Sequence, residues 1–453
     1  MIANMVATKT IYNSNTVTFR PFHWSLVTQS LFYMFLLTAP LNVYGLGTGL
    51  FNYRFSRIFL VLTVFAIVME RLAKMRNLLL RLRPFECLLG IYCFLAFLSA
   101  FYVSNYSVFV TSFFRLVECI LMLYVIRIFT HERGYWLRSV QIYLLSSISV
   151  LLASLYQVIH VLRGNLYGTV LPFPSFQLLD RYPELQNWVY NSAIIGGAHR
   201  VSSTFADPNT LAGYCASLIP FAIVMVLISN KNRMIQWQSF LNFFILLGLV
   251  AMIISTVSKS GFLSMVLGVL LTLKFIFMKF SVKQRLKIGI ALTFIIVFCV
   301  MFGLQRIDLI SQRISLGDSG HIAYTLSAWK SFVEGSWSFG QGFGQCGSAH
   351  SVVLTALLDL GLLGAILIFM ITVQPLKYVK YLSRLSSKMN YDLRIRNYFF
   401  LMSASLASFA AIVLGLYLYG YWIHPFTWIS ISLLLSLVSH VQRGFKSGVF
   451  VKL

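Results

Sequence analysis

The chain has 453 residues, of which 58% are hydrophobic and only 11% are charged. A soluble domain carries about 25% charged residues, so this composition excludes an ordinary soluble protein and indicates that lipid surrounds most of the chain. The formal net charge of +24 would also suit a nucleic-acid-binding protein. The positions of the basic residues along the chain must therefore distinguish a membrane protein from a nucleic-acid-binding protein.

About twelve stretches have the roughly 20 apolar residues needed to cross the hydrocarbon layer of a membrane. In chain order they are 24–46, 55–73, 85–104, 106–129, 138–162, 210–229, 237–257, 262–280, 286–304, 350–376, 397–418 and 421–440. The sequence therefore predicts an all-α, polytopic membrane protein with about twelve transmembrane helices, in which residues 1–453 form a single domain. We expect no signal peptide, because the first 22 residues lack an apolar segment before a cleavage site.

The basic residues gather in alternate loops between these stretches. They are Arg71, Lys74, Arg76, Arg81 and Arg83; Arg127, Arg133 and Arg138; Lys231 and Arg233; Lys279, Lys283, Arg285 and Lys287; Lys377, Lys380, Arg384, Lys388, Arg394 and Arg396; and Arg443, Lys446 and Lys452. This positive-inside pattern places both termini in the cytoplasm, with Arg54 and Arg57 as an outnumbered exception. The charge is interpreted as topology, with anionic membrane lipids as partners and no nucleic acid.

The same topology places two long loops, 163–209 and 305–349, on the side of the membrane opposite to the termini. Loops of this length are uncommon unless they are functional or disordered. Both contain aromatic residues such as Trp188 and Trp329, which are depleted in disordered segments. We therefore expect the functional surface to lie on this outer face.

Only one of the six cysteines, Cys346, falls in an outer loop, so no disulfide framework is expected. No cysteine or histidine spacing suits a metal site, and there is no Walker loop or dinucleotide motif. We expect neither a metal nor a cofactor.

The stretch GGAHRVSSTFADPNTLAGYC, residues 196–215, stands out from its apolar surroundings. Asp207 and Pro208 suit the N-cap and first position of a helix, whose N-terminal end carries partial positive charge. Arg200, just upstream, has the planar guanidinium that binds phosphate oxygens. The stretch predicts a diphosphate site, or else a plain helix start with Arg200 as an interfacial anchor.

A second stretch, GQGFGQCGSAHSVVLTALLDLGLLG, occupies residues 340–364. Its glycine-rich turn leads to His350 at the mouth of a helix on the same face, where a histidine can act as general base. Alternatively His350 only caps the helix, and Gly361 and Gly364 serve helix packing. Asp359 should lie about 14 Å from His350 along a straight helix, and we expect it to pair with an arginine inside the bundle.

Arg115 and Glu118 lie three residues apart in the stretch 106–129. This spacing lets the two side chains pair on one helix face. Charges inside a membrane are costly and mark functional sites by default. A structural ion pair and a contact with a lipid phosphate both remain open.

With these motifs the sequence resembles the O-antigen ligase and polymerase family of bacterial membrane glycosyltransferases. The family's Arg-x-Ser-Gly-Thr-Phe motif and the Pro-Asn after it correspond to residues 200–205 and 208–209, and its Gly-x-Gly, His-Asn and acidic-Gly-x-x-Gly motif to residues 342–364. A Ser-Arg-Gly motif corresponds to residues 258–261, and the resemblance spans about 196–375. Departures are Ser203 in place of glycine, Ser351 in place of asparagine, Lys259 in place of arginine, and Arg313 as the nearest arginine before Trp329.

The resemblance implies an enzyme of the bacterial inner membrane that works at its periplasmic face. The donor would be a glycan on undecaprenyl diphosphate, and the acceptor a sugar hydroxyl on lipid A-core. Arg200 would stabilise the diphosphate and His350 would accept the proton of the acceptor, without metal and with inversion. The residues expected to contact substrate are Lys259, Arg313, His321, Asn209, Trp329 and Arg115.

Two alternatives stay open at this stage. A polymerase of the same family would extend a growing O-antigen or exopolysaccharide by one repeat unit, using the same donor chemistry. A transporter or flippase for lipid-linked sugars would be a different class of protein, in which charged residues line a central cavity rather than one membrane face.

Overall fold

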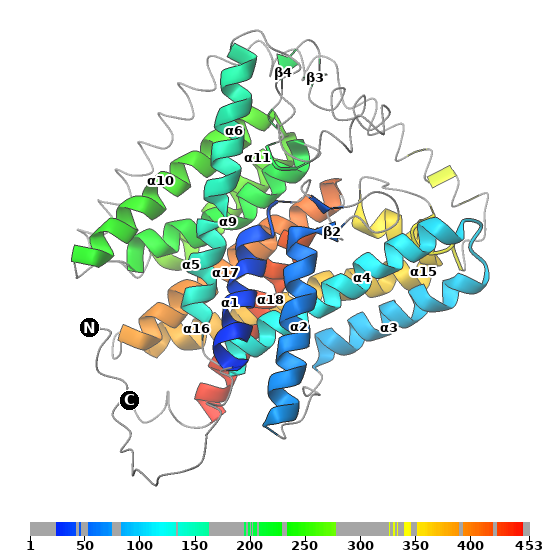
Figure 1. Cartoon of the computed structure of the whole chain (residues 1–453), viewed down its shortest axis with the longest axis horizontal. Coiled ribbons are helices and arrows are strands. Elements are labelled where there is room, and N and C mark those ends of the chain that lie inside the picture. Colours follow the sequence, from blue (N-terminus) through cyan, green and yellow to red (C-terminus); the bar gives the residue numbers. More distant parts are fainter. Residues whose placement is uncertain are drawn as a thin grey trace, which may run out of the picture.

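The computed structural model describes residues 24–41, 45–46, 53–74, 83–132, 135–162, 194–195, 198–199, 201, 203–205, 208–228, 233–277, 326, 329–330, 333, 339–345, 351–388, 393–419 and 424–446. Within these residues the chain is helical apart from two short antiparallel pairs (Figure 1). Strand β1 (Gly45–Leu46) pairs with β2 (Tyr53–Arg54), and β3 (Ile194–Ile195) pairs with β4 (Ala198–His199). The predicted all-α class is confirmed.

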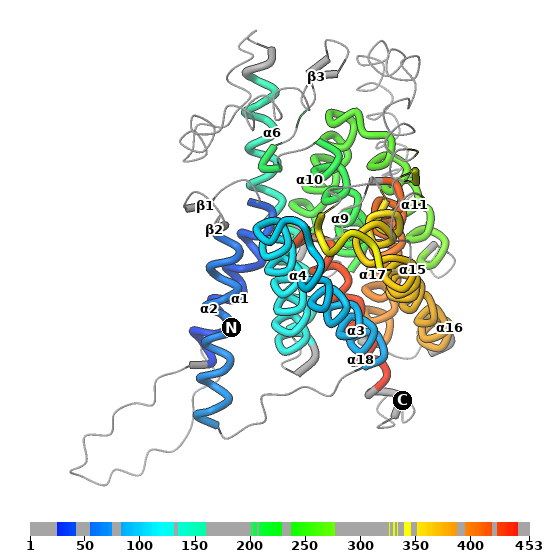
Figure 2. Tube along the Cα trace, turned by 90° about the vertical axis from the view of Figure 1, so that its right-hand side faces the viewer, coloured from blue at the N-terminus to red at the C-terminus, as the bar shows by residue number. Residues whose placement is uncertain are grey.

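The helices follow one another in the order that the apolar stretches predict. They are α1 (Trp24–Thr38), α2 (Phe55–Ala73), α3 (Pro84–Leu98), η1 (Ser99–Phe101), α4 (Tyr106–Arg127), η2 (Ile128–Glu132), α5 (Trp136–Leu145), α6 (Ser147–Leu162), α9 (Pro208–Ile228), α10 (Arg233–Thr256), α11 (Lys259–Phe277), α15 (Val352–Val373), η4 (Gln374–Tyr378), α16 (Val379–Lys388), α17 (Leu393–Tyr419) and α18 (Pro425–Lys446). Figure 2 shows α1 and α2 on one side of the bundle and α15 and α16 on the other.

Nine helical segments in the described part of the chain are long and apolar enough to cross a membrane. They are Pro84–Phe101, Tyr106–Thr130, Trp136–Ile159, Pro208–Ile228, Trp237–Thr256, Lys259–Ile276, Val352–Ser386, Ile395–Leu418 and Pro425–Gln442. The chain is thus a polytopic helical membrane protein. Of the other expected spans, the first is a shorter apolar helix over Ser25–Thr38, and the second is the 19-residue helix α2. The stretch 286–304 lies outside the described residues.

Helix α9 lies at the centre of the bundle. Every residue from Pro208 to Met225 is buried, and α10, α11 and α17 all pack against this helix. A helix that is apolar all round is stable only when it is surrounded. In contrast, α2, α3 and α10 expose large apolar side chains, among them Phe65, Phe94 and Phe244, as expected of helices that face lipid.

Several buried serines of α17 and α18 donate to carbonyl groups of their own helix. Ser403 Oγ donates to the Phe399 carbonyl at 2.8 Å, and Ser439 Oγ donates to the Leu435 carbonyl at 2.7 Å. A serine that bonds to the carbonyl four residues earlier is compatible with an apolar environment. These serines therefore let two central helices approach closely without unpaired polar groups at those positions.

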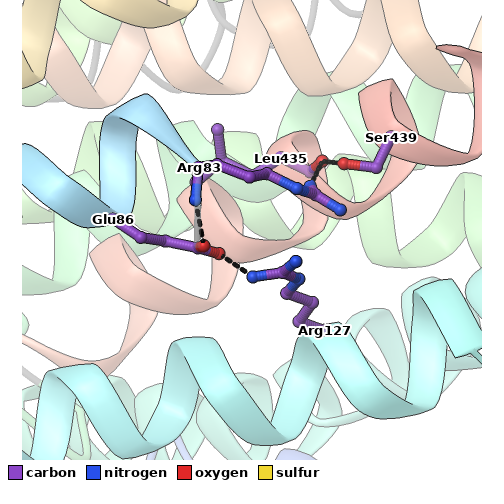
Figure 3. A network of polar contacts seen from close by, with 5 residues as sticks. All are labelled: Arg83, Glu86, Arg127, Leu435 and Ser439. Atoms are coloured by element: carbon purple, nitrogen blue, oxygen red, sulfur yellow. Dashed lines mark hydrogen bonds and ion pairs between the residues drawn. The ribbon is translucent and has the colours of Figure 1, made fainter. Parts of the chain in front are cut away.

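A network of charged groups holds the start of α3 against the end of α4 and against α18 (Figure 3). Glu86 accepts a hydrogen bond from the Arg83 amide at 2.9 Å and forms an ion pair with Arg127. The Arg83 guanidinium donates to the Leu435 carbonyl at 3.1 Å. Since a buried charge is tolerated only when it is paired, the network fixes the start of α3 and the end of α4 against the middle of α18.

Helix α15, which corresponds to the predicted span 350–376, is broken at Gly361. Gly361 has φ 68° and ψ −164°, a conformation that glycine adopts at little steric cost. The break frees carbonyl groups that a regular helix would bond internally. Two of them are taken by a loop, since the amides of Gln341 and Gly342 donate to Leu358 and Asp359 at 2.8 and 2.9 Å.

Candidate functional site

Helices α9 and α11 begin side by side at one end of the bundle. A sharp turn at Val257, with φ 49°, leads from α10 into α11, and Ser258 Oγ accepts a hydrogen bond from the Gly261 amide at 3.2 Å. A Cβ at Gly261 would collide with the Ala212 side chain of α9. The Ser258–Gly261 motif is therefore an N-cap followed by a close helix contact, and it brings two helix N-termini with their partial positive charge together.

The segment after Arg200 is packed over this end. The Val201 amide donates to the Ser255 carbonyl at 3.2 Å. The Ser203 amide donates to Gln157 Oε1 at 2.7 Å, and Thr204 Oγ1 donates to the Pro40 carbonyl at 2.7 Å. The segment thereby joins α6, the end of α1 and the end of α10, and its described residues are buried.

Ser203 has an unusual backbone conformation. Its φ of 53° lies in the left-handed region, where glycine is free of strain and other residues are uncommon. Glycine is the residue that the resemblance leads one to expect here. In this chain the serine compensates with its hydroxyl, which donates to the Val150 carbonyl at 2.7 Å.

An aromatic cluster extends the site towards the start of α18. The Phe205 ring lies 5.2 Å from Tyr214 and 6.4 Å from Phe426, measured between centroids. His424 stacks on Phe426 at 5.8 Å and is half-buried. The sequence analysis missed this histidine, although His424-Pro425 precedes a helix just as Asp207-Pro208 does.

The structure places only some of the expected site residues. Lys259 is the first residue of α11 and is exposed; Asn209 is the second residue of α9 and is 8% exposed. The contact between α9 and α11 brings both to one end of the bundle. Trp329 is 54% exposed, and Arg115 lies near the middle of α4. The residues Arg200, Arg313, His321 and His350 lie outside the described part of the chain.

The glycine-rich turn before His350 is bound to the connection between α3 and α4. Gln345 Oε1 accepts from the Asn105 amide at 2.9 Å, and Gln345 Nε2 donates to the Asn105 carbonyl at 3.0 Å. The Phe343 amide donates to Ser99 Oγ at 3.0 Å, and the Phe343 ring meets Tyr92 edge-on at 6.2 Å. These contacts assign the turn a structural role in positioning the chain that leads to α15.

Three glycines of this turn adopt positive φ, namely Gly340, Gly342 and Gly344. A Cβ at Gly340 would stand 2.6 Å from the backbone of Asp359, next to the break in α15. The loop and the broken helix therefore fit together only because this position lacks a side chain.

Asp359 is 4% exposed and lies close to the end of α3. Desolvation, and secondly the negative charge of Asp359, raise the pKa of Tyr102 just beyond η1. The Tyr102 hydroxyl donates to the Phe339 carbonyl at 2.8 Å. The arginine partner expected for Asp359 stays a prediction.

The two motif segments are held by different helices. The segment 201–205 contacts α1, α6, α9, α10 and α18, whereas the turn 339–345 contacts the α3–α4 connection and α15. The expected proximity of Arg200 and His350 therefore stays a prediction.

The structure shows no ion pair between Arg115 and Glu118, which was one of the two roles left open for them. Glu118 instead accepts two hydrogen bonds from Arg57 of α2, from Nε at 3.1 Å and from Nη2 at 2.8 Å. In the sequence Arg57 stands out only as an exception to the distribution of basic loop residues. The pattern could not reveal this pair, because it depends on which helices pack together.

Among the residues that the structure describes, no three or more His, Cys, Asp or Glu side chains come together as a metal-binding group would require. Comparison of the chain with protein-family models finds no match, and comparison with curated proteins finds none.

Proposed function

We propose that the protein is a glycosyltransferase that moves a glycan from undecaprenyl diphosphate to a sugar hydroxyl at the periplasmic face of the bacterial inner membrane. The observation that carries the proposal is the common end of α9 and α11. There two helix N-termini, exposed Lys259 and the segment that directly follows Arg200 come together. Positive ends of helices together with cationic side chains are suited to phosphate groups.

In this mechanism Arg200, with Lys259 and Arg313, neutralises the charge that develops on the departing diphosphate. His350 accepts the proton of the acceptor hydroxyl as its oxygen attacks the anomeric carbon. Attack on the face opposite to the leaving group inverts that carbon. Asn209 and His321 contribute hydrogen bonds to the substrate, and Trp329 stacks on a sugar ring.

The proposed topology has twelve transmembrane helices with both termini in the cytoplasm, and the loops 163–209 and 305–349 in the periplasm. In protein whose Cys346 is replaced by serine, cysteines introduced at Gly168 and Ser336 are expected to react with an impermeant maleimide in cells whose outer membrane alone is permeable. A cysteine introduced at Lys231, in a loop assigned to the cytoplasm, serves as the matched control. Labelling of the two loop cysteines only after lysis would overturn this arrangement.

Ligation of finished O-antigen to lipid A-core is the reaction we favour, and polymerisation of repeat units is the alternative. The lipopolysaccharide profile of a deletion strain separates them. Loss of all attached O-antigen with accumulation of lipid-linked chains indicates a ligase. A band with a single repeat unit indicates a polymerase.

An assay of purified protein in detergent distinguishes the proposed transferase from a transporter for lipid-linked sugars. The proposed enzyme joins the glycan to an added acceptor and releases undecaprenyl diphosphate without any membrane. A transporter moves the intact donor across a vesicle and leaves the diphosphate bond unbroken. Unchanged donor in detergent, from protein that complements the deletion strain, would reject the transferase.

A further inference from the structure

Helix α6 carries a buried stripe that is largely polar, although the helix is predominantly apolar. Its exposed side includes Leu152 and Leu155, which are 62% and 56% exposed and suit a helix that faces lipid. The stripe recurs at the spacing of one helix face, and its members, none more than 6% exposed, are Ser147, Val150, Ser154 and Gln157. A glutamine amide removed from water costs free energy unless it is paired, so Gln157 requires a hydrogen-bond partner inside the protein.

Gln157 pairs with the backbone of a single residue in the segment that follows Arg200. Its Oε1 accepts a hydrogen bond from the Ser203 amide at 2.7 Å, and its Nε2 donates to the Ser203 carbonyl at 3.4 Å. The Ser203 hydroxyl donates to the Val150 carbonyl of the same stripe at 2.7 Å. A primary amide has both a donor and an acceptor, so a glutamine can complement the N–H and the C=O of one residue at once.

The bonded part of α6 belongs to the segment Trp136–Ile159, which is long and apolar enough to cross a membrane. The irregular segment around Ser203 therefore lies beside a candidate membrane span. Irregular backbone at membrane depth is tolerated only where it is buried in protein and its polar groups are satisfied. The polar stripe of α6 meets this requirement for Ser203, which is 4% exposed.

A second anchor lies next to Arg200 itself. The amide of Val201, which is 3% exposed, donates to the Ser255 carbonyl of α10 at 3.2 Å. Arg200 lies outside the described residues, but it is bonded directly to Val201, and consecutive Cα atoms are about 3.8 Å apart. The chain that leads away from Arg200 is thus held at residue 201 by α10 and at residue 203 by α6.

We propose that Gln157 is a positioning residue, which by holding Ser203 sets where the chain carries the Arg200 guanidinium. The assignment rests on the proposed function, in which Arg200 stabilises the departing diphosphate. Such stabilisation depends on donors that are already in place when charge develops, and misplacement by about 1 Å can cost up to about 10²-fold in rate. In this role Gln157 does not contact the substrate and acts through Arg200.

The kinetic test uses Gln157→Met in purified full-length protein, with a lipid-linked donor and a sugar acceptor. Methionine has a similar linear shape and lacks the paired donor and acceptor. We expect kcat to fall by about 10- to 100-fold, whereas the KM for the acceptor should stay within about twofold, because only stabilisation of the leaving group is lost.

A double-mutant cycle separates positioning from a structural role. Because Gln157 acts through Arg200, adding Gln157→Met to Arg200→Ala should lower the residual kcat by less than about twofold. The same loss in both backgrounds would show that Gln157 contributes only to structure, and would overturn the proposal.

A measurement of mobility makes the test independent of transfer. A nitroxide label on Arg200→Cys, in protein whose native cysteines are replaced by serine, reports the motion of residue 200 by electron paramagnetic resonance. Gln157→Met is expected to make this label more mobile. Either an unchanged spectrum or a wild-type kcat in folded Gln157→Met would overturn the positioning role. Wild-type protein without transfer activity would instead reject the proposed function, and the spectrum would still report whether Gln157 holds residue 200.

The matched control is Gln29→Met in α1. Gln29 also lies in an apolar helix, but its Nε2 donates to the Tyr33 hydroxyl of the same helix at 2.9 Å, so kcat and label mobility should be unchanged. Gln157→Asn serves if Gln157→Met does not fold, because it keeps a primary amide in the buried position and withdraws it by one methylene group. It is expected to give the same two effects in smaller measure, and wild-type values of both would overturn the proposal.

Discussion

The segments that flank Arg200 and His350 are held in the molecule in contrasting ways. Residues 201 and 203–205 are buried between several helices and lie just before α9, whose residues Pro208 to Met225 are all buried. The turn 339–345 lies at the periphery, with Phe339 70% exposed. It is attached by hydrogen bonds to one connection and to the break in α15.

Changes in the two segments are therefore expected to affect different properties, the stability of the bundle in one case and the position of a nearby segment in the other. Changes in the buried segment disturb contacts of the central bundle and lower the free energy of unfolding. The peripheral turn has fewer buried contacts, and such regions contribute less to global stability. We therefore expect changes there to act mainly on the placement of the chain that leads to His350.

The largest effects are expected at the two proposed catalytic residues. Loss of a general base typically costs about 10²–10⁴-fold in rate, and loss of a charge-stabilising donor costs about 10²–10³-fold. His350→Ala and Arg200→Ala should each lower turnover per folded molecule by such factors, measured with purified variants and a lipid-linked donor. Arg200→Lys should recover little, because an ammonium lacks the paired geometry of the guanidinium.

The pH dependence of transfer distinguishes the two roles. Only His350→Ala should remove the rise in rate that accompanies deprotonation of a histidine near neutral pH, whereas Arg200→Ala should keep that profile at a lower rate. If folded His350→Ala retained wild-type turnover, His350 would not be the base, and His321 and His424 would be examined next.

A smaller loss is expected from Gly340→Ala in the peripheral turn. With φ 72° and a Cβ position 2.6 Å from the Asp359 backbone, the loop must shift away from the break in α15. Misplacement of a reacting group by about 1 Å can cost up to about 10²-fold, so we expect a loss of about tenfold in turnover. The melting temperature should fall as well, because alanine is strained at this φ and the contact with the Asp359 backbone must open, so turnover is compared per folded molecule.

Gly90→Ala is the matched control for that substitution. Gly90 lies in α3, and a Cβ there meets nothing within 4 Å. The substitution should leave turnover unchanged and raise the free energy of unfolding by at most about 1 kcal/mol. Equal loss of turnover in both variants would show that the contact between the turn and α15 does not position the site.

The sequence predicted the positions of most helices because hydropathy and helix length are local properties. The stretch 210–229 corresponds to α9 within two residues, and 106–129 corresponds to α4 in the same way. The break at Gly361 could not be predicted, because a glycine within an apolar run also suits a continuous helix. Its conformation depends on the loop that bonds to the freed carbonyls of Leu358 and Asp359.

For the candidate site, the sequence indicated the chemical types of residues better than their partners. Lys259 and Asn209 do lie at one end of the bundle, because each stands at the start of a helix and those helices pack together. The pairing of Glu118 with Arg57 and the position of His424 depend on contacts between helices far apart in the chain. Spacing within one helix carries no information about such contacts.

The smallest effects are expected at Ser203, where backbone strain and a hydrogen bond oppose each other. A left-handed conformation costs a non-glycine residue about 1–2 kcal/mol, and the bond from the Ser203 hydroxyl to the Val150 carbonyl returns about 0.5–1.5 kcal/mol. Ser203→Gly removes both, so the free energy of unfolding should stay within about 1 kcal/mol of wild type. Ser203→Ala removes only the hydrogen bond and should be less stable.

Ser203→Val should be the least stable of the three variants, because a β-branched side chain at φ 53° adds strain to the lost hydrogen bond. Melting of the purified variants in detergent gives the order directly, with glycine nearest wild type, then alanine, then valine. If residue 203 instead had ordinary extended backbone, the order of melting temperatures would be reversed. Valine would then be the most stable variant and glycine the least, because valine favours extended backbone and glycine destabilises it. The order therefore reports the backbone conformation next to Arg200 independently of any transfer assay.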